Sequence, residues 1–198
     1  ALRRDVEQSD NRLLTAVNFA IAGNIIDMGA KTGLRESDLV DAIEHAAENE
    51  LAGDIDAFVS AVRNAEHILY LCDNAGEIVF DTLLIEQLGP ERVTAAVRGK
   101  PIINDALMED ARAAGLTDLV PVIGNGSDAP GTVLDECNEE FRTAFESADL
   151  IISKGQGNFE TLSDSNRPIF FLFKVKCPVV AATTGVPLGT HVLRRTRI

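Results

Sequence analysis

The sequence predicts an α/β protein with a Rossmann-like, three-layer, mostly parallel sheet and a helical region at its N-terminus. After His67, short runs rich in β-branched and aromatic residues alternate with helical stretches. Strands joined by helices require right-handed crossovers, which are typical of a parallel sheet covered on both faces. Before His67, apolar residues recur at helical spacing instead. A chain of 198 residues, 45% of them hydrophobic, is long enough for one sizeable core.

The first 65 residues form the predicted helical region, which we expect to pack on the core. A second helix is expected from residue 37 to about residue 50, and a third, capped by Asp54, through Arg63. The first helix is indicated by apolar residues at helical spacing: Leu13, Leu14, Val17, Ala20, Ile21, Ile25 and Met28.

Residues 66–198 form the predicted Rossmann-like α/β domain, and no repeat or linker divides them. The expected strands are 67–72, 92–97, 119–123, 149–153, 168–173, 178–182 and 190–194. The expected helices between them are 77–88, 104–114, 131–147 and a short one at 158–163.

Charge and composition exclude several classes of partner. The net charge of −13 argues against nucleic acid and anionic membranes, because both require basic patches. The longest apolar run, 169–173, is far too short to span a bilayer, and no signal peptide is visible. Cys72, Cys137 and Cys177 show no CxxC spacing, so we expect reduced thiols and a cytoplasmic protein.

Polar residues gather where predicted strands end. Asp73-Asn74 follows the first strand directly, and Asn104-Asp105 follows the second after the segment RGKPII. The third such segment is SKGQGN at 153–158, and the loop GNGSDAPGT at 124–132 is a fourth. In doubly wound sheets, ligands bind beyond the carboxyl ends of the strands, so all four segments are expected on one rim.

Each acid–amide pair has two interpretations. Taken singly, either pair could cap the helix that follows it. Taken together, two carboxylates with carboxamide neighbours provide the oxygen ligands that hard divalent cations prefer. A cation between them would also relieve the repulsion of the two carboxylates.

Lys154 lies between the third strand end and two glycines, at positions 155 and 157. It is either a surface lysine in a turn or a phosphate-binding lysine, with glycines that let backbone N–H groups approach an anion. The GxxxxGK[ST] spacing of a Walker A loop is absent. His45, His67 and His191 lie away from these rims, and no nucleophile elbow is present, which favours metal-assisted chemistry over a histidine-based nucleophile.

Five segments, spread in order over essentially the whole chain, resemble one family. They are GNIID (23–27), DNAGE (73–77), RGKPIINDAL (98–107), GNGSDAPGT (124–132) and SKGQGNFETL (153–162). The chain resembles the metal-dependent, ARMT1-like damage-control phosphatases, formerly called DUF89, and within them the prokaryotic subfamily I. Family chains usually carry more helical sequence before the GN-x-x-D motif than this chain does.

The resemblance implies hydrolysis of small phosphorylated metabolites with one divalent metal, such as Mg²⁺, Mn²⁺, Co²⁺ or Ni²⁺. It implies metal ligation by Asp73, Asn74 and Asp105, with Asp73 and Asn74 also catalytic. Lys154 would act in catalysis near the substrate phosphate. Further residues expected at the substrate are Gly155, Asn158, Asn24, Asp27 and Arg98.

Two other functions are weighed against a phosphatase. A Rossmann-like sheet can host S-adenosylmethionine, but a carboxyl methyltransferase needs a glycine-rich loop after the first strand and an acidic end to the second. Here these positions hold DNAGE and Val97-Arg98. The other alternative is a non-catalytic module that binds a metal or metabolite. The particular substrate, the physiological metal, the oligomeric state and the choice between direct attack by Asp73 and attack by water stay open.

Overall fold

The computed structural model describes residues 1–23 and 45–196, whose secondary structure is built around one seven-stranded sheet. The expected site residues Asn24 and Asp27 lie outside the described residues, as does most of the helix expected at 37–50. Residues 45–48 at its end form the 3₁₀ turn η1 (His45–Glu48). The predicted α/β class with a mostly parallel sheet is confirmed.

The order of the strands across the sheet is β1-β7-β6-β5-β2-β3-β4. Strands β2 to β6 all run parallel to one another, while β7 is antiparallel to β6 and parallel to β1. From β2 the chain proceeds outward to β3 and β4, and then returns to the other side of β2 with β5. The strands are β1 (Leu51–Gly53), β2 (Ile68–Leu71), β3 (Val93–Val97), β4 (Val122–Gly124), β5 (Leu150–Lys154), β6 (Ile169–Lys174) and β7 (His191–Arg195).

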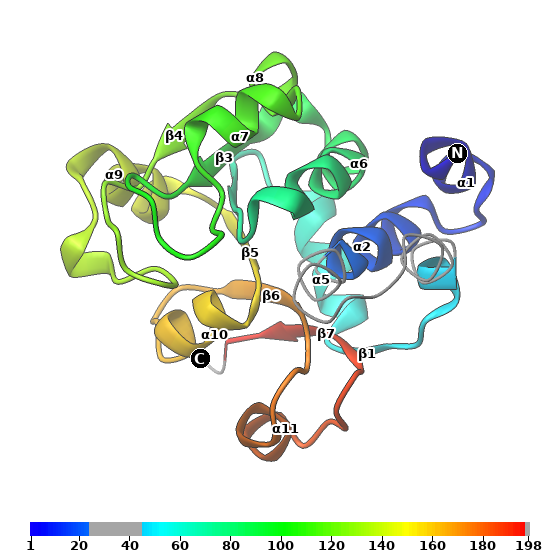
Figure 1. Cartoon of the computed structure of the whole chain (residues 1–198). Helices are drawn as coiled ribbons and strands as arrows, with labels where there is room; N and C mark the ends of the chain where they lie inside the picture. Colours follow the sequence, from blue (N-terminus) through cyan, green and yellow to red (C-terminus); the bar gives the residue numbers. More distant parts are fainter. Residues whose placement is uncertain (24–44, 197–198) are drawn as a thin grey trace.

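Helices cover both faces of this sheet and give three layers (Figure 1). One face packs against α2 (Arg12–Ala22), α5 (Ile55–Asn64), α6 (Ile78–Leu88), α7 (Met108–Ala113) and α8 (Leu116–Leu119). The other face packs against α9 (Glu139–Ser147), α10 (Gln156–Leu162) and α11 (Pro178–Thr184). The first helix, α1 (Leu2–Gln8), precedes α2 and contributes Val6 to the first of these cores.

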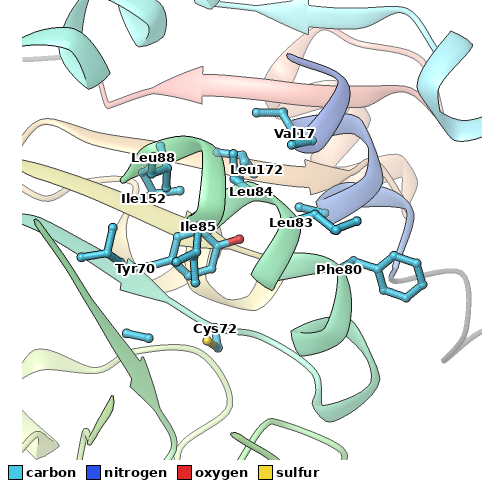
Figure 2. Packing of buried hydrophobic residues seen from close by; sticks show 14 of the residues in the cluster. Val17, Tyr70, Cys72, Phe80, Leu83, Leu84, Ile85, Leu88, Ile152 and Leu172 are labelled. Atoms are coloured by element: carbon cyan, nitrogen blue, oxygen red, sulfur yellow. The ribbon is translucent and has the colours of Figure 1, made fainter. Parts of the chain in front are cut away.

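The strands that carry the site are buried on both faces, which explains their continuous apolar sequences. All four residues of β2 and all five of β5 are buried, as expected for parallel strands under two helical layers. Helix α6 packs beside α2 on the same face of the sheet, and Figure 2 shows Leu84 and Ile85 of α6 near Tyr70 and Leu172 of the sheet. Because α6 is enclosed on most sides, its apolar residues are not confined to one stripe.

Two segments differ in type from the sequence-based expectation. Residues 178–182, expected as a strand, form α11 instead. Pro178 stands in the first turn of that helix, where its missing N–H has no cost, and the Cys177 sulfur accepts from Val180 N. Residues 51–53, within the expected helical region, form β1 and pair with β7, so this region also supplies an edge strand.

Two helices begin later than expected. The helix expected at 104–114 begins at Met108, because Asn104 and Asp105 pair with the segment after β2. The helix expected at 131–147 is α9, which begins at Glu139 and is capped by Asn138, whose Oδ1 accepts from Phe141 N at 2.8 Å. In both cases the residues before the helix are engaged at the strand ends, where they build the site.

None of the helices in the described ranges combines the length and apolarity needed to cross a membrane. The three cysteines are free, and Cys72 and Cys137 are buried. His67 is exposed and His191 is buried in β7.

His191 belongs to a buried polar cluster between β7 and α2. Its Nδ1 lies 3.2 Å from Oδ1 of Asn18, and its Nε2 lies 3.5 Å from Nδ2 of Asn49. Burial, with a smaller contribution from Lys174, lowers the pKa of His191 from 6.5 to about 4. The folded protein therefore holds this imidazole neutral over a range in which the unfolded chain protonates it.

We expect this cluster to cost stability in mild acid. As pH falls from 6.5 toward 4, the unfolded chain takes up a proton at His191 that the folded chain refuses, so the free energy of unfolding decreases. His191→Gln removes that proton uptake. Urea unfolding of both proteins between pH 4 and pH 8 checks this: the advantage of the wild type over the variant should shrink below pH 6.5 and stay constant above pH 7.5. Parallel curves over the whole range would contradict the assignment.

Candidate active site

The candidate site lies at the carboxyl end of β2, where the strand order reverses between β5 and β3. Asp73 and Asn74 follow β2, and backbone bonds draw the Asp105 segment against them. Asn74 and Asp105 form an antiparallel bridge, and Ala106 N donates to Asp73 O at 2.7 Å. Ala75 N donates to Asn104 O at 2.9 Å. The structure thus brings together Asp73, Asn74 and Asp105, as the strand-end pattern predicts.

Neither acid–amide pair acts as a helix cap. The Asn74 side chain accepts no bond from the turn η2 (Ala75–Glu77) that it precedes, and no side chain caps α6. Helix α7 begins only after Leu107, whose N–H donates to Asp110. The capping interpretation of the two pairs is therefore wrong, and their side chains are left for other partners.

Each of the three expected metal ligands keeps one oxygen without a hydrogen bond from any described residue. Asn74 Nδ2 donates to Asp73 Oδ2 at 3.0 Å and to Glu77 Oε1 at 2.7 Å, which leaves the amide oxygen of Asn74 and Asp73 Oδ1 without a donor. Arg98 Nε donates to Asp105 Oδ2 at 2.6 Å, which leaves Asp105 Oδ1. Two carboxylates and one carboxamide suit a hard divalent cation, with remaining positions for water or substrate.

The balance of buried charge also fits a divalent cation. Four carboxylates are buried around the end of β2, and Lys154 and Arg98 are the cations hydrogen-bonded to them in the described part of the chain, which leaves two negative charges. The carboxylates belong to Asp73, Glu77, Asp81 and Asp105. No group of three His, Cys, Asp or Glu side chains in the described ranges is arranged to hold a metal, so the candidate set depends on the Asn74 amide as its third ligand.

The electrostatics of Asp73 reflect this excess of negative charge. Burial, then Glu77 and then Asp105 raise the pKa of Asp73 to about 8, although Lys154 and Arg98 oppose the increase. Burial also raises the pKa of Asp81, with Lys154 acting against it and Glu77 in favour. Ionisation of both carboxyl groups is therefore less favourable than in water. A bound cation would make their ionisation more favourable.

Lys154 is one of the most deeply buried side chains of the protein, with 1% of its surface exposed. Its Nζ donates to Asp81 Oδ1 at 2.7 Å, to Glu77 Oε2 at 2.9 Å and to Ala20 O at 2.7 Å. Burial alone would lower the pKa of Lys154, but Asp81 and Glu77 outweigh it and the pKa is raised. Lys154 is therefore not a surface lysine, and all three of its N–H groups are engaged.

Glu77, Asp81 and Tyr70 belong to the site's surroundings but were not among the expected site residues. Glu77 and Asp81 lie four residues apart, so they share one face at the start of α6, and both contact Lys154. Tyr70 Oη donates to Asp81 Oδ1 at 2.7 Å. A carboxylate amid the apolar sequence IVFDTLLI was the signal that could have identified Asp81, because such a position is otherwise reserved for the core.

Gly155 is required at its position by Asp73. A Cβ atom on Gly155 would lie 1.9 Å from Asp73 Oδ2, and the residue has a φ of +82°. Its own N–H donates to Leu172 O at 3.0 Å. Of the backbone amides expected at an anion, those of residues 156–158 have no acceptor among the described residues, whereas that of Gly155 is engaged.

The remaining expected substrate residues, Arg98 and Asn158, are buried on the other face of the sheet from Lys154. Arg98 bonds to Asp105 and to Asn158, and Asn158 Nδ2 donates to Lys154 O at 2.7 Å. Their expected contact with substrate stays a prediction. The structure shows that both side chains connect the strand ends to one another.

The turn that leads to Asp105 is strained. Ile103 has a φ of +49°, which is unfavourable for a β-branched residue, and its side chain is 76% exposed. Asp105 N donates to Ile102 O at 3.0 Å and closes the turn. Strain of this kind persists where the surrounding contacts fix the backbone, and it is common beside functional residues.

A prominent hollow lies away from this edge. A cavity of about 390 Å³ next to β1 and β7 is lined in part by Asp54, Arg194 and Arg195. It contains none of the expected site residues, and Arg194 Nη1 already donates to Thr184 O. The chemistry of the strand ends, rather than the size of a cavity, therefore locates the candidate site.

A parallel α/β sheet with a carboxylate- and amide-lined site at its switch point defines a class of Rossmann-like proteins that bind ligands at strand ends. Within this class, the damage-control phosphatase ARMT1-like domain matches residues 1–192, and the chain belongs to that family. The resemblance seen in the sequence is thereby confirmed.

Several archaeal proteins are similar to the chain. A damage-control phosphatase of Pyrococcus horikoshii is 44% identical over 92% of this chain and 64% of its own length. A damage-control phosphatase of Archaeoglobus fulgidus is 40% identical over 96% of this chain and 67% of its own. An uncharacterized protein of Methanocaldococcus jannaschii is 42% identical over 96% of this chain and 66% of its own. The chain thus spans about two thirds of the length of these relatives.

A solved structure supports the fold directly. The crystal structure of a DUF89 family protein from Pyrococcus horikoshii superposes with a TM-score of 0.86 at 41% identity. The match covers 99% of this chain and 72% of the other. At this identity and coverage, the sheet described here is the sheet of the family.

We expect removal of the Lys154 charge to destabilise the protein strongly. Lys154→Met leaves two buried carboxylates without their cation, which typically costs about 3–5 kcal/mol. Adding Asp81→Asn removes one of those carboxylates, so the double variant should be more stable than Lys154→Met alone. Urea unfolding at pH 7 measures both effects. A loss below about 1 kcal/mol in Lys154→Met, the range of exposed pairs, would contradict a role for Lys154 in charge balance.

Proposed function

We propose that this protein is a metal-dependent phosphomonoesterase that hydrolyses small phosphorylated metabolites. The observation that supports this most strongly is the grouping of Asp73, Asn74 and Asp105 at the switch point, each with an oxygen that no described residue occupies. Membership of the damage-control phosphatase family and two relatives with that name support the same activity. Together with the free thiols, this is consistent with the expected cytoplasmic enzyme.

We propose that Asp73, Asn74 and Asp105 hold one divalent cation, Mg²⁺ or a transition metal such as Mn²⁺, Co²⁺ or Ni²⁺. When bound, the cation would balance the two excess negative charges and polarise a phosphoryl oxygen of the substrate. Glu77 accepts a hydrogen bond from Asn74 Nδ2 and so fixes the orientation of the Asn74 amide, which leaves its oxygen available as a ligand. Arg98 fixes Asp105 in the same way from the other side.

The phosphoryl group would be held next to this set. Lys154 and Arg98 both act electrostatically on Asp73, so their charge reaches the place where a phosphate would lie. Because the three N–H groups of Lys154 are engaged, a direct contact with phosphate requires that it release one acceptor. The amides of residues 156–158 are the backbone donors we propose for equatorial charge in the transition state, with Asn24 and Asp27 near the substrate.

Two routes of attack remain, and the geometry of Asp73 is compatible with each. Asp73 Oδ1 has no hydrogen bond from the described residues, so it can attack phosphorus directly and form an acyl phosphate as the ester P–O bond breaks and the alcohol leaves; water then hydrolyses the acyl phosphate. Alternatively, Asp73 stays a ligand and water attacks. Trapping during turnover separates them: an acyl phosphate captured on Asp73 by acid quench and borohydride reduction supports covalent attack, and its absence under conditions of rapid turnover supports direct attack by water.

We expect Asp73→Asn and Asp105→Asn to abolish Mn²⁺- or Mg²⁺-dependent hydrolysis of p-nitrophenyl phosphate, with a loss of about 100-fold or more, because each removes a charged ligand. Both variants should fold, because each removes one negative charge from a site with an excess of them, and in Asp105→Asn an amide oxygen can still accept from Arg98 Nε. Asp128→Asn is the matched control, because Asp128 is 63% exposed and outside the set. Chelation with EDTA should abolish the activity of the wild type and of the control alike.

Wild-type activity in both site variants would show that the site assignment is wrong. A folded wild type that binds Mn²⁺ but is inactive toward a broad panel of phosphorylated metabolites would favour a non-catalytic binding module. Calorimetric binding of S-adenosylmethionine would favour the methyltransferase alternative.

A further inference from the structure

Arg98 occupies an unusual position for a residue expected to contact substrate. Its side chain is 4% exposed, and each nitrogen of the guanidinium group donates to a different partner. Nε donates to Asp105 Oδ2 at 2.6 Å, Nη1 to Thr132 Oγ1 at 2.9 Å and Nη2 to Asn158 Oδ1 at 2.9 Å. A planar guanidinium with three fixed acceptors holds a definite orientation, which a lysine could not reproduce.

The two neutral partners of Arg98 are themselves fully engaged. Thr132 Oγ1 donates to Asn158 Oδ1 at 2.8 Å, so Asn158 Oδ1 accepts two hydrogen bonds, one from Thr132 and one from Arg98. Asn158 Nδ2 donates to Lys154 O at 2.7 Å and to Cys72 O at 3.3 Å. Arg98, Thr132 and Asn158 thus form a closed buried network, which we call the Arg98 network. It joins the end of β3 to the ends of β2 and β5.

The loop before Thr132 is packed to support this network. A Cβ atom on Gly99 would lie 2.3 Å from Gly126 Cα, so the segment after Arg98 and the GNGSDAPG loop meet backbone to backbone. Asn125 Oδ1 accepts from Gly99 N at 2.9 Å and from Ser127 N at 3.0 Å. The GNGSDAPGT segment holds none of the proposed metal ligands or catalytic residues. These contacts indicate that its role is to support the Arg98 network.

We infer that Arg98 is a positioning residue: Thr132 and Asn158 hold its guanidinium group, and its Nε fixes Asp105, so that Oδ2 is occupied and Oδ1 is presented as a ligand. This inference rests on the proposed metal site. It assigns Thr132 and Asn158 to the support of that site and removes Arg98 from direct contact with substrate. Partners that orient a ligating carboxylate commonly change metal affinity about 10- to 100-fold when altered.

Mn²⁺ binding, measured by calorimetry or by the electron paramagnetic resonance of free Mn²⁺, tests this without turnover. Arg98→Lys keeps the charge and loses the three-way geometry, so the Kd for Mn²⁺ should increase about 10-fold or more. Thr132→Val removes one hydroxyl at nearly constant volume and should increase the Kd in the same direction by a smaller factor. Lys100→Met is the matched control, because Lys100 lies two residues from Arg98 with its side chain 62% exposed.

The Michaelis constant separates positioning from substrate contact. At saturating Mn²⁺, the KM of Arg98→Lys for p-nitrophenyl phosphate should remain within about 2-fold of the wild type. A positioning residue does not touch the substrate, so its loss leaves substrate binding unchanged once the metal is bound. An unchanged Kd for Mn²⁺ with a raised KM would overturn the inference and assign Arg98 to the substrate.

The outcomes distinguish this inference from the proposed function. If the wild type binds one Mn²⁺ and both Arg98→Lys and Thr132→Val bind it equally well, the proposed site stands and the inference is overturned. If the wild type binds no Mn²⁺, the proposed function fails and the inference fails with it. Where Arg98→Lys does not fold, Thr132→Val decides, since that substitution introduces no buried charge.

Discussion

The concentration of buried negative charge at the end of β2 is the constraint on which the site depends. Burying a carboxylate is costly unless a cation or hydrogen bonds compensate it. Here Asp73, Glu77, Asp81 and Asp105 are compensated only in part, by Lys154 and Arg98. The pKa values of Asp73 and Asp81 are raised, chiefly by burial and by neighbouring carboxylates, which reflects this incomplete compensation. A divalent cation would complete the balance in a way that monovalent partners cannot.

The parallel sheet makes this arrangement possible because it places one cation on each face. Alternation along β5 directs Lys154 toward α6, where Glu77 and Asp81 accept, and Ala20 O ties it to the end of α2. Arg98, just beyond β3, lies on the opposite face with Asn158 of α10. Asp73 lies between these two cations, at the carboxyl end of the central strand β2. The helical region is therefore connected to the site through the same lysine that neutralises the carboxylates.

The sequence predicts the fold class, most strands and the meeting of Asp73, Asn74 and Asp105, since burial on both faces leaves clear apolar runs and strand ends expose their polar residues. The role of these three residues as a site stays a prediction. It does not predict β1, which is only three residues long, or α11, where Pro178 at the first turn outweighs two valines. The roles of Lys154 and Arg98 could not be derived from spacing, because their partners Asp81 and Thr132 lie 73 and 34 residues away. Such pairings can be predicted only once the order of the strands in the sheet is known.

Anomalous diffraction from crystals grown with Mn²⁺ tests the central claim most directly, because it locates the ion independently of activity. The account predicts one strong peak per chain in contact with Asp73 Oδ1, the Asn74 amide oxygen and Asp105 Oδ1, with Arg98 still bonded to Asp105 Oδ2. A peak held by other residues, or no peak at Mn²⁺ concentrations that support hydrolysis, would contradict it.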